Sequence, residues 1–171
     1  MANVVEFETE SGETVYEKLR ELYKPEVVKL LFIGESPPQG GNFFYRCNSH
    51  LFRNTKEAFE NAGLEFSLES FKKFGCWLYD VCEVPVNGMP AEQRRKTIQQ
   101  GLPKALEVID SLNPANIVVV KKGDMEKIVF RAICDKHNYK ENETAFNLPF
   151  PSHGHQPIYR EGLTEIIKRL T

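Results

Sequence analysis

The sequence has no cysteines in a C-x-x-C arrangement, no long apolar run and no excess of basic residues, and each absence argues against a class of protein. The spacing of its four cysteines does not suggest a zinc or iron–sulfur site, so we expect reduced thiols and no metal or other cofactor. No stretch approaches the roughly 20 apolar residues of a membrane-spanning helix. The first residues lack the basic and apolar regions of a signal peptide, so we expect a cytoplasmic protein without a membrane partner.

The charge balance is close to even, with 22 Lys and Arg residues against 24 Asp and Glu residues. Basic residues nevertheless cluster at 92–96, 121–122 and 153–160. Such clusters are usually solvated surface, although enzymes that act on DNA can use local basic patches on a neutral body. The net charge of −2 therefore neither supports nor excludes nucleic acid as a partner.

Helical and extended patterns alternate along the chain, without repeats or a linker. Helices are predicted at 13–24, 50–62, 68–74, 90–112 (as one helix or two, with a break or kink at 101–103), 124–137 (with Asp124 as N-cap) and 160–170. Strands are predicted at 27–34, 76–84, 116–122 and 144–150. Because parallel strands need long crossovers, we expect one monomeric α/β domain over 1–171. Its architecture would be a three-layer α/β/α sandwich around a mostly parallel sheet of about four strands.

Ligands of open parallel sheets bind beyond the carboxyl ends of the strands. This rule selects residues 34–48, 80–88 and 148–160 as the walls of a site. In the first of these, "GESPPQGGNFFY" begins at Gly34 and contains no Gly-Lys-Ser/Thr, so it is not a P-loop. Phe43, Phe44 and Tyr45 could each be core residues, but three in a row are hard to bury together, and one ring could stack on a planar base.

The last loop, "LPFPSHGHQPIYR", carries two histidines two positions apart. They could bind a metal, but no third ligand is evident, so we expect no metal site. Alternatively they are solvated, or they contact a substrate oxygen or a phosphate.

Together these loops resemble the signatures of the uracil-DNA glycosylase superfamily. "LLFIGESPPQGGNFF" is similar to the first signature, a buried strand ending in Gly-x-x-Pro, with an aromatic about ten residues after the glycine. Its Gly-Glu-x-Pro form is most similar to the branch first known from thermophiles, although the four iron–sulfur cysteines of that branch are absent. "LPFPSHGHQ" is similar to the second signature, His-Pro-Ser. Between them, "GCWLYDVCEV" stands where that superfamily has a strand ending in a base-reading residue, often Asn.

The resemblance implies a glycosylase that hydrolyses the N-glycosidic bond of a flipped uracil-like or otherwise deaminated base in DNA. Glu35 would polarise or deprotonate the attacking water, Phe44 would stack on the base and Asp80 would face its hydrogen-bonding edge. The remaining implied residues are His153 as a second catalytic group, Gly34, Ser36 and Asn48 at the substrate, and Ser152, His155 and Gln156 at the DNA.

Two departures from the superfamily pattern keep alternatives open. Phe150 replaces the motif histidine, so His153 or His155 would have to act from further along the loop. Asp80 in place of Asn would repel the carbonyl oxygens of uracil unless it is protonated, and could instead favour an amino group. The chain could therefore be a non-catalytic nucleic-acid-binding or nucleobase-binding module, or a small-molecule hydrolase. In those cases Glu35 could simply pair with an Arg or Lys, and Asp80 could cap a helix or turn.

Overall fold

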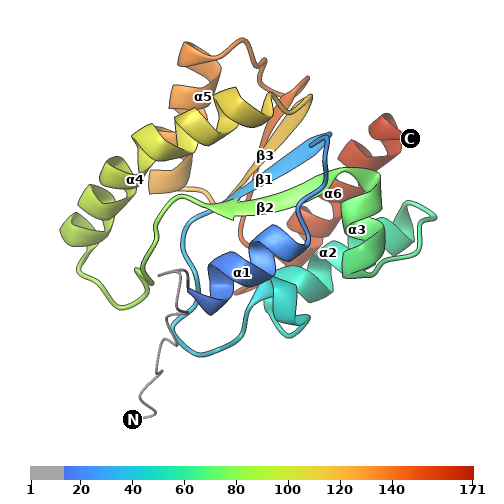
Figure 1. Cartoon of the computed structure of the whole chain (residues 1–171), viewed down its shortest axis with the longest axis horizontal. Coiled ribbons are helices and arrows are strands. Elements are labelled where there is room, and N and C mark those ends of the chain that lie inside the picture. The colour runs from blue at the N-terminus through green and yellow to red at the C-terminus, as the bar shows by residue number, and fades with distance from the viewer. Residues whose placement is uncertain (1–13) are drawn as a thin grey trace.

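Four parallel strands form one sheet at the centre of the computed structural model, which describes residues 14–171 (Figure 1). The strands are β1 (Leu30–Gly34), β2 (Cys76–Asp80), β3 (Asn116–Val120) and β4 (Ala145–Leu148). Their order is β2-β1-β3-β4, and every residue of β1, β2 and β3 is buried. Burial on both faces explains why these strands are continuous apolar runs in the sequence.

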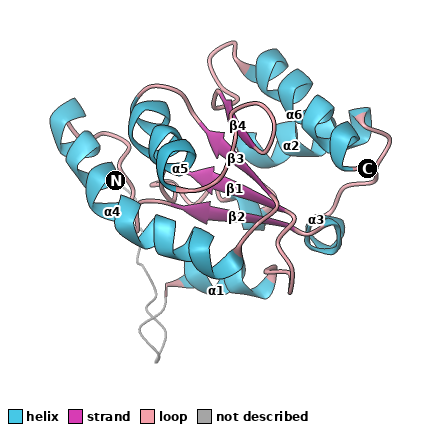
Figure 2. Cartoon of the chain, turned by 90° about the horizontal axis from the view of Figure 1, so that it is seen from above, coloured by secondary structure: helices cyan, strands magenta, loops and turns pink. Residues whose placement is uncertain are grey.

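Helices cover both faces of the sheet (Figures 1 and 2). The α-helices are α1 (Val15–Leu22), α2 (His50–Asn61), α3 (Leu68–Phe74), α4 (Ala91–Leu112), α5 (Arg131–Lys136) and α6 (Gln156–Leu170). A 3₁₀ turn, η1 (Phe44–Arg46), precedes α2, and a π-helical segment, η2 (Met125–Phe130), leads into α5. Helices α4 and α5 lie on one face, and α2, α3 and α6 lie on the other. The predicted α/β/α sandwich is thus confirmed.

The strand order creates a switch point between β1 and β3. From β1 the chain crosses to β2 on one side, whereas from β3 it crosses to β4 on the other side. The loops that leave β1 and β3 therefore diverge and open a crevice beyond the ends of these two strands, which is where open parallel sheets bind ligands. Gly34 ends β1 and Val120 ends β3, so Glu35 and Lys121 are the first residues beyond the sheet at this crevice.

Local signals explain where several helices begin and end. Thr14 and Glu17 form a reciprocal capping box at the start of α1, and the Ser49 hydroxyl accepts a hydrogen bond from the Phe52 N–H at the start of α2. Gly75 ends α3 in a left-handed conformation with φ of 90°. The predicted helix at 68–74 agrees with α3 at both ends.

Other predictions of local structure were wrong in detail. The strand expected at 76–84 ends at Asp80. Of the two alternatives for 90–112, the structure has one helix, which runs through Pro103. Asp124 makes no capping hydrogen bond: its backbone is already helical, with φ of −64° and ψ of −34°, and its carboxylate pairs with Arg95 of α4. The last helix begins at Gln156 rather than at 160, which shortens the final loop. Of the expected domain 1–171 and first helix 13–24, residues 1–13 lie outside the described residues.

Candidate functional site

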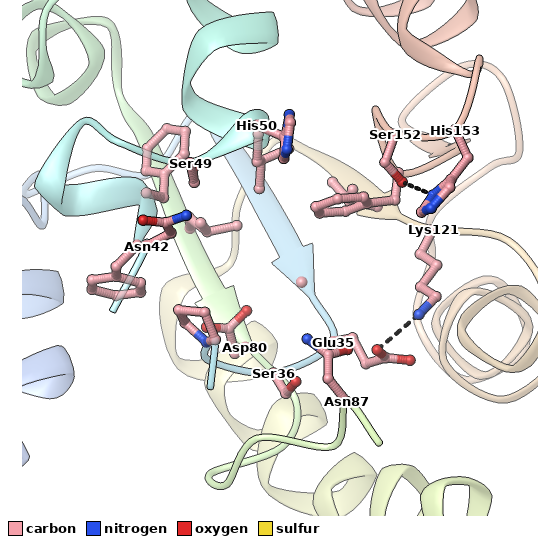
Figure 3. Close-up of a pocket in the computed structure, with 18 of the residues that line it drawn as sticks. Glu35, Ser36, Asn42, Ser49, His50, Asp80, Asn87, Lys121, Ser152 and His153 are labelled. Atoms are coloured by element: carbon pink, nitrogen blue, oxygen red, sulfur yellow. Dashed lines mark hydrogen bonds and ion pairs between the residues drawn. The ribbon is translucent and has the colours of Figure 1, made fainter. Parts of the chain in front are cut away.

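A cavity of about 660 Å³ lies beyond the carboxyl ends of β1, β2 and β3 (Figure 3). All three stretches that the sequence selected as site walls contribute to its lining. Its polar wall is made by the side chains of Glu35, Ser36, Asn42, Ser49, His50, Asp80, Asn87, Arg94, Lys121, Ser152 and His153. Apolar residues line the rest of it, among them Phe43, Phe44 and Phe150. Pockets for small ligands range from about 300 to 1,000 Å³, so a single nucleoside would fit.

Most of the residues named from the sequence meet in this cavity. Seven of the ten line it: Gly34, Glu35, Ser36, Phe44, Asp80, Ser152 and His153. Asn48, His155 and Gln156 are not among its lining residues. The Asn48 side chain accepts a hydrogen bond from the Phe43 N–H at 2.7 Å, so it shapes the loop of the first signature. His155 and Gln156 instead form the start of α6.

Glu35 is held between two cations that come from different elements. Lys121 Nζ lies 2.9 Å from Oε1, Arg94 Nε lies 3.1 Å from Oε2, and Arg94 Nη2 also donates to Oε1. The pairing that the sequence left open as the alternative is therefore present. A carboxylate offers about four lone-pair sites, and these three donors leave one site on Oε2 for a water or a ligand. The Glu35 side chain is 10% exposed, and the residue lines the cavity.

Asp80 lies over the backbone of β1 and is 8% exposed. Its Oδ2 accepts a hydrogen bond from Arg20 of α1 at 3.1 Å, so it caps no helix. Burial raises the pKa of Asp80, the Arg20 charge opposes this shift, and the Glu35 charge adds to it. The other oxygen, Oδ1, occupies the space that a side chain at residue 34 would fill, because a Cβ there would overlap it. Gly34 is therefore required for Asp80 to reach the cavity.

The three consecutive aromatics are all buried, each with 3% exposure, which corrects the expectation that they are hard to bury together. The Phe44 ring packs against Tyr45, Phe52 and Phe71 with centroid distances of 5.1–5.7 Å. The Tyr45 hydroxyl accepts a hydrogen bond from the Leu78 N–H and donates to the Leu78 carbonyl oxygen, which fixes the loop to β2. Phe43 and Phe44 still line the cavity, although both residues are almost fully buried.

The final loop brings a polar rim to the cavity. The His153 ring Nδ1 is 3.0 Å from the Ser152 hydroxyl, and the His153 backbone has a positive φ of 51°. A left-handed conformation is uncommon for a residue with a side chain and is found at functional turns. Figure 3 shows both side chains above Lys121, at one side of the cavity.

Sequence reasoning missed the two cations that hold Glu35. Both lie in basic clusters that are visible in the sequence, Arg94 at 92–96 and Lys121 at 121–122. A basic cluster by itself predicts only a surface patch, because it does not reveal which of its members turns inward. Lys121 follows a buried strand directly, as Glu35 and Val81 do, and this shared position is the signal that could have identified it. Asn42, Ser49, His50 and Asn87 carried no such signal.

No group of three or more His, Cys, Asp or Glu residues within 14–171 is placed to bind a metal ion. In the same part of the chain, no helix has both the length and the apolar character to cross a membrane. A comparison with known protein families found none that matches this chain, and a comparison with curated proteins found no relative.

Proposed function

We propose that this protein is a DNA glycosylase of the uracil-DNA glycosylase type, which hydrolyses the N-glycosidic bond of a uracil-like or otherwise deaminated base flipped out of DNA. The observation that carries the proposal is that Glu35, Phe44, Asp80 and the Ser152–His153 loop line one cavity at the switch point of the sheet. These residues stand far apart in the sequence, and the fold brings them to one edge of the sheet.

The chemistry requires three things of such a cavity. A carboxylate must stabilise the cationic sugar or orient the attacking water, donors must meet the negative charge that grows on the departing base, and a slot must hold the ring. Glu35 supports the first requirement, because its three ion-pair contacts fix it in place and leave one site on Oε2. The volume of about 660 Å³ and the apolar lining residues, among them Phe43 and Phe44, support the third.

Asp80 would donate to a carbonyl-bearing base edge only in its protonated form, which burial favours and the Arg20 ion pair opposes. Burial raises the pKa of this carboxyl, which favours its protonated form relative to an exposed Asp. A protonated carboxyl donates a hydrogen bond, whereas a carboxylate only accepts one. With Oδ2 bonded to Arg20, the group that would face a base is Oδ1.

One observation favours a second candidate, a non-catalytic module that binds a nucleobase or nucleic acid in the same cavity. The position that has histidine in the superfamily is Phe150, which lines the cavity and brings no hydrogen-bonding group. In this alternative the Glu35 ion pairs would be structural.

Release of the base from oligonucleotides separates the two candidates. Single-stranded and double-stranded substrates carry uracil, hypoxanthine, xanthine or a thymine mismatch, and alkali then cleaves any abasic site. We expect wild-type protein to produce abasic sites and Glu35→Gln to lose about 10²–10⁴-fold in rate, the range of positioned acid–base groups. Glu83→Gln is the control, because Glu83 is an exposed carboxylate that pairs with Lys104 outside the cavity.

Two results would count against the enzyme. If wild-type protein leaves every base in place but shifts the oligonucleotides in a gel at low salt, the binding module is favoured. If Glu35→Gln stays folded and cleaves as fast as wild type, Glu35 has no part in the reaction.

A further inference from the structure

The backbone of Lys121 is held in a conformation that residues with side chains rarely adopt. Its φ is +93°, and such a conformation persists only where the surroundings impose it. Two hydrogen bonds with residues of β4 hold this conformation, one at the N–H and one at the carbonyl oxygen of Lys121. The Lys121 N–H donates to the Leu148 carbonyl oxygen at 2.7 Å, and the Lys121 carbonyl oxygen accepts from the Asn147 side-chain amide at 2.9 Å.

This backbone sends the Lys121 side chain into the cavity rather than into solvent. Its ammonium group lies 2.9 Å from Glu35 Oε1 across the switch point (Figure 3), and the side chain is 35% exposed. An ammonium group has three donors, and the contact with Glu35 uses one of them. The neighbouring Lys122 instead points outward and donates to the Asn147 carbonyl oxygen at 2.8 Å.

Arg94 is the other cation of the cavity, and two of its nitrogens are fixed on the Glu35 carboxylate. Its Nε and Nη2 both donate to Glu35, and Nη2 is also 3.5 Å from the Asn87 side-chain oxygen. Its planar fork is thus committed to the carboxylate, whereas Lys121 reaches the same carboxylate with a single donor.

Lys121 also lies beside the position where the resemblance expects an imidazole. Val120 is the last residue of β3 and pairs with Leu148, the last residue of β4. Lys121 therefore follows β3 at the same level of the sheet at which the chain continues from β4 toward Phe150. Both Lys121 and Phe150 line the cavity. The phenyl ring has no donor, and the ammonium group one strand away has two that Glu35 does not use.

We propose that Lys121 contacts the departing base and stabilises the negative charge that develops on it, in place of the histidine that is absent at position 150. This inference rests on the proposed function. As the bond between C1′ and the base nitrogen breaks, its electron pair moves to the base and spreads onto a carbonyl oxygen. Lys121 donates a hydrogen bond to that oxygen and keeps its proton. Water adds to C1′, and the proton it loses balances the charge of the released base.

The test compares bases that differ in how well they carry negative charge. The probes are single-stranded oligonucleotides with uracil or 5-fluorouracil, and with hypoxanthine or xanthine; the second base of each pair forms the more stable anion. Rates are measured for wild type, Lys121→Met, Lys121→Arg and the control Lys122→Met. Methionine has no donor but similar length, and it meets the same backbone constraint at position 121.

We expect Lys121→Met to slow release of the poorer leaving base by about 10²-fold, the effect of removing one donor to a developing anion. The loss should be several-fold smaller for the better leaving base of the same pair, because that anion needs less stabilisation. Lys121→Arg should recover most of the rate, and Lys122→Met should cleave as fast as wild type.

The outcomes separate this inference from the function on which it rests. The four bases are also placed in double-stranded oligonucleotides, and if wild-type protein releases none of them from either form, the proposed function fails and the role of Lys121 fails with it. If wild type is active and Lys121→Met slows both bases of a pair equally, the glycosylase remains and Lys121 serves only to hold Glu35. If Lys121→Met slows neither base, the glycosylase remains and Lys121 has no part in the reaction. Thermal unfolding of each variant shows whether a lost rate reflects a lost fold.

Discussion

A Cβ added to Gly34 would overlap the Asp80 side chain, which predicts that Gly34→Ala destabilises the protein through Asp80 alone. A Cβ at residue 34 would overlap Asp80 Oδ1 and lie 3.6 Å from Asp80 Cγ. Its next neighbour is Leu78 Cδ1 at 3.7 Å, an ordinary van der Waals distance. Asp80 has little freedom to withdraw, because it is 8% exposed and bonded to Arg20.

The expected magnitude follows from two opposing effects. Overpacking a filled site costs roughly 1–3 kcal/mol. Replacing Gly by Ala at a position without a positive φ returns about 0.4–1 kcal/mol, because the unfolded chain loses freedom. Gly34 is not among the residues with positive φ, so the net loss is about 1–2 kcal/mol. In a background of Arg20→Met with Asp80→Ala the clash is gone, and the same substitution should stabilise by about 0.4–1 kcal/mol.

Urea unfolding of the four proteins gives this coupling as a double-mutant cycle. The background removes both charges of the pair, so that no buried cation is left without a partner. Gly40→Ala is the control, because a Cβ there meets nothing within 4 Å and the free energy of unfolding should not fall. An equal effect of Gly34→Ala in both backgrounds would refute the reasoning, since it would show that Asp80 does not occupy the space above Gly34.

Two further predictions concern stability and its dependence on pH. Gly101→Ala should destabilise by about 1–3 kcal/mol although Ala is the better helix former, because a Cβ there would overlap the Val81 carbonyl oxygen and lie 3.0 Å from the Val81 carbonyl carbon; a stabilised variant in urea unfolding would contradict the contact between α4 and the end of β2. Asp80→Asn should gain stability relative to wild type as the pH rises above 3.8. A carboxyl whose pKa is raised on folding stabilises the fold only while it is protonated. This contribution is lost as the pH rises through the folded-state pKa. Unfolding measured from pH 4 to 8 tests this sign, and a difference that shrinks with rising pH would mean that Arg20 outweighs burial.

The order of the elements could be predicted because each depends on a local pattern. The buried strands are apolar runs, and the helices around 50–62 and 68–74 begin at Ser49 and Ser67, whose hydroxyls cap them. Alternation of these elements is enough to predict parallel strands. The ends of elements were less predictable where a distant residue decides them. The Asp124 carboxylate, for example, makes no capping hydrogen bond and instead forms an ion pair with Arg95.

Part of the candidate site was likewise predictable from the sequence, and part was not. Position at a strand end pointed to Glu35, Asp80 and the final loop, because the carboxyl ends of parallel strands share one edge of a sheet. Burial of three consecutive aromatics was not predictable, since it depends on partners such as Phe71 and Tyr16 that come from other elements.

Local sequence patterns were enough to predict an α/β domain with a parallel sheet and polar loops at one edge of it. Hydrophobic periodicity and helix caps act within a few residues, so they can be recognised in the sequence. Which charged side chains pair in the site, in contrast, depends on the tertiary structure. Arg94 lies 59 positions from Glu35 and Lys121 lies 86 positions from it, and no local pattern specifies such a pair. The strand order brings the ends of β1 and β3 together, and the space that Gly34 leaves open admits Asp80 beside them.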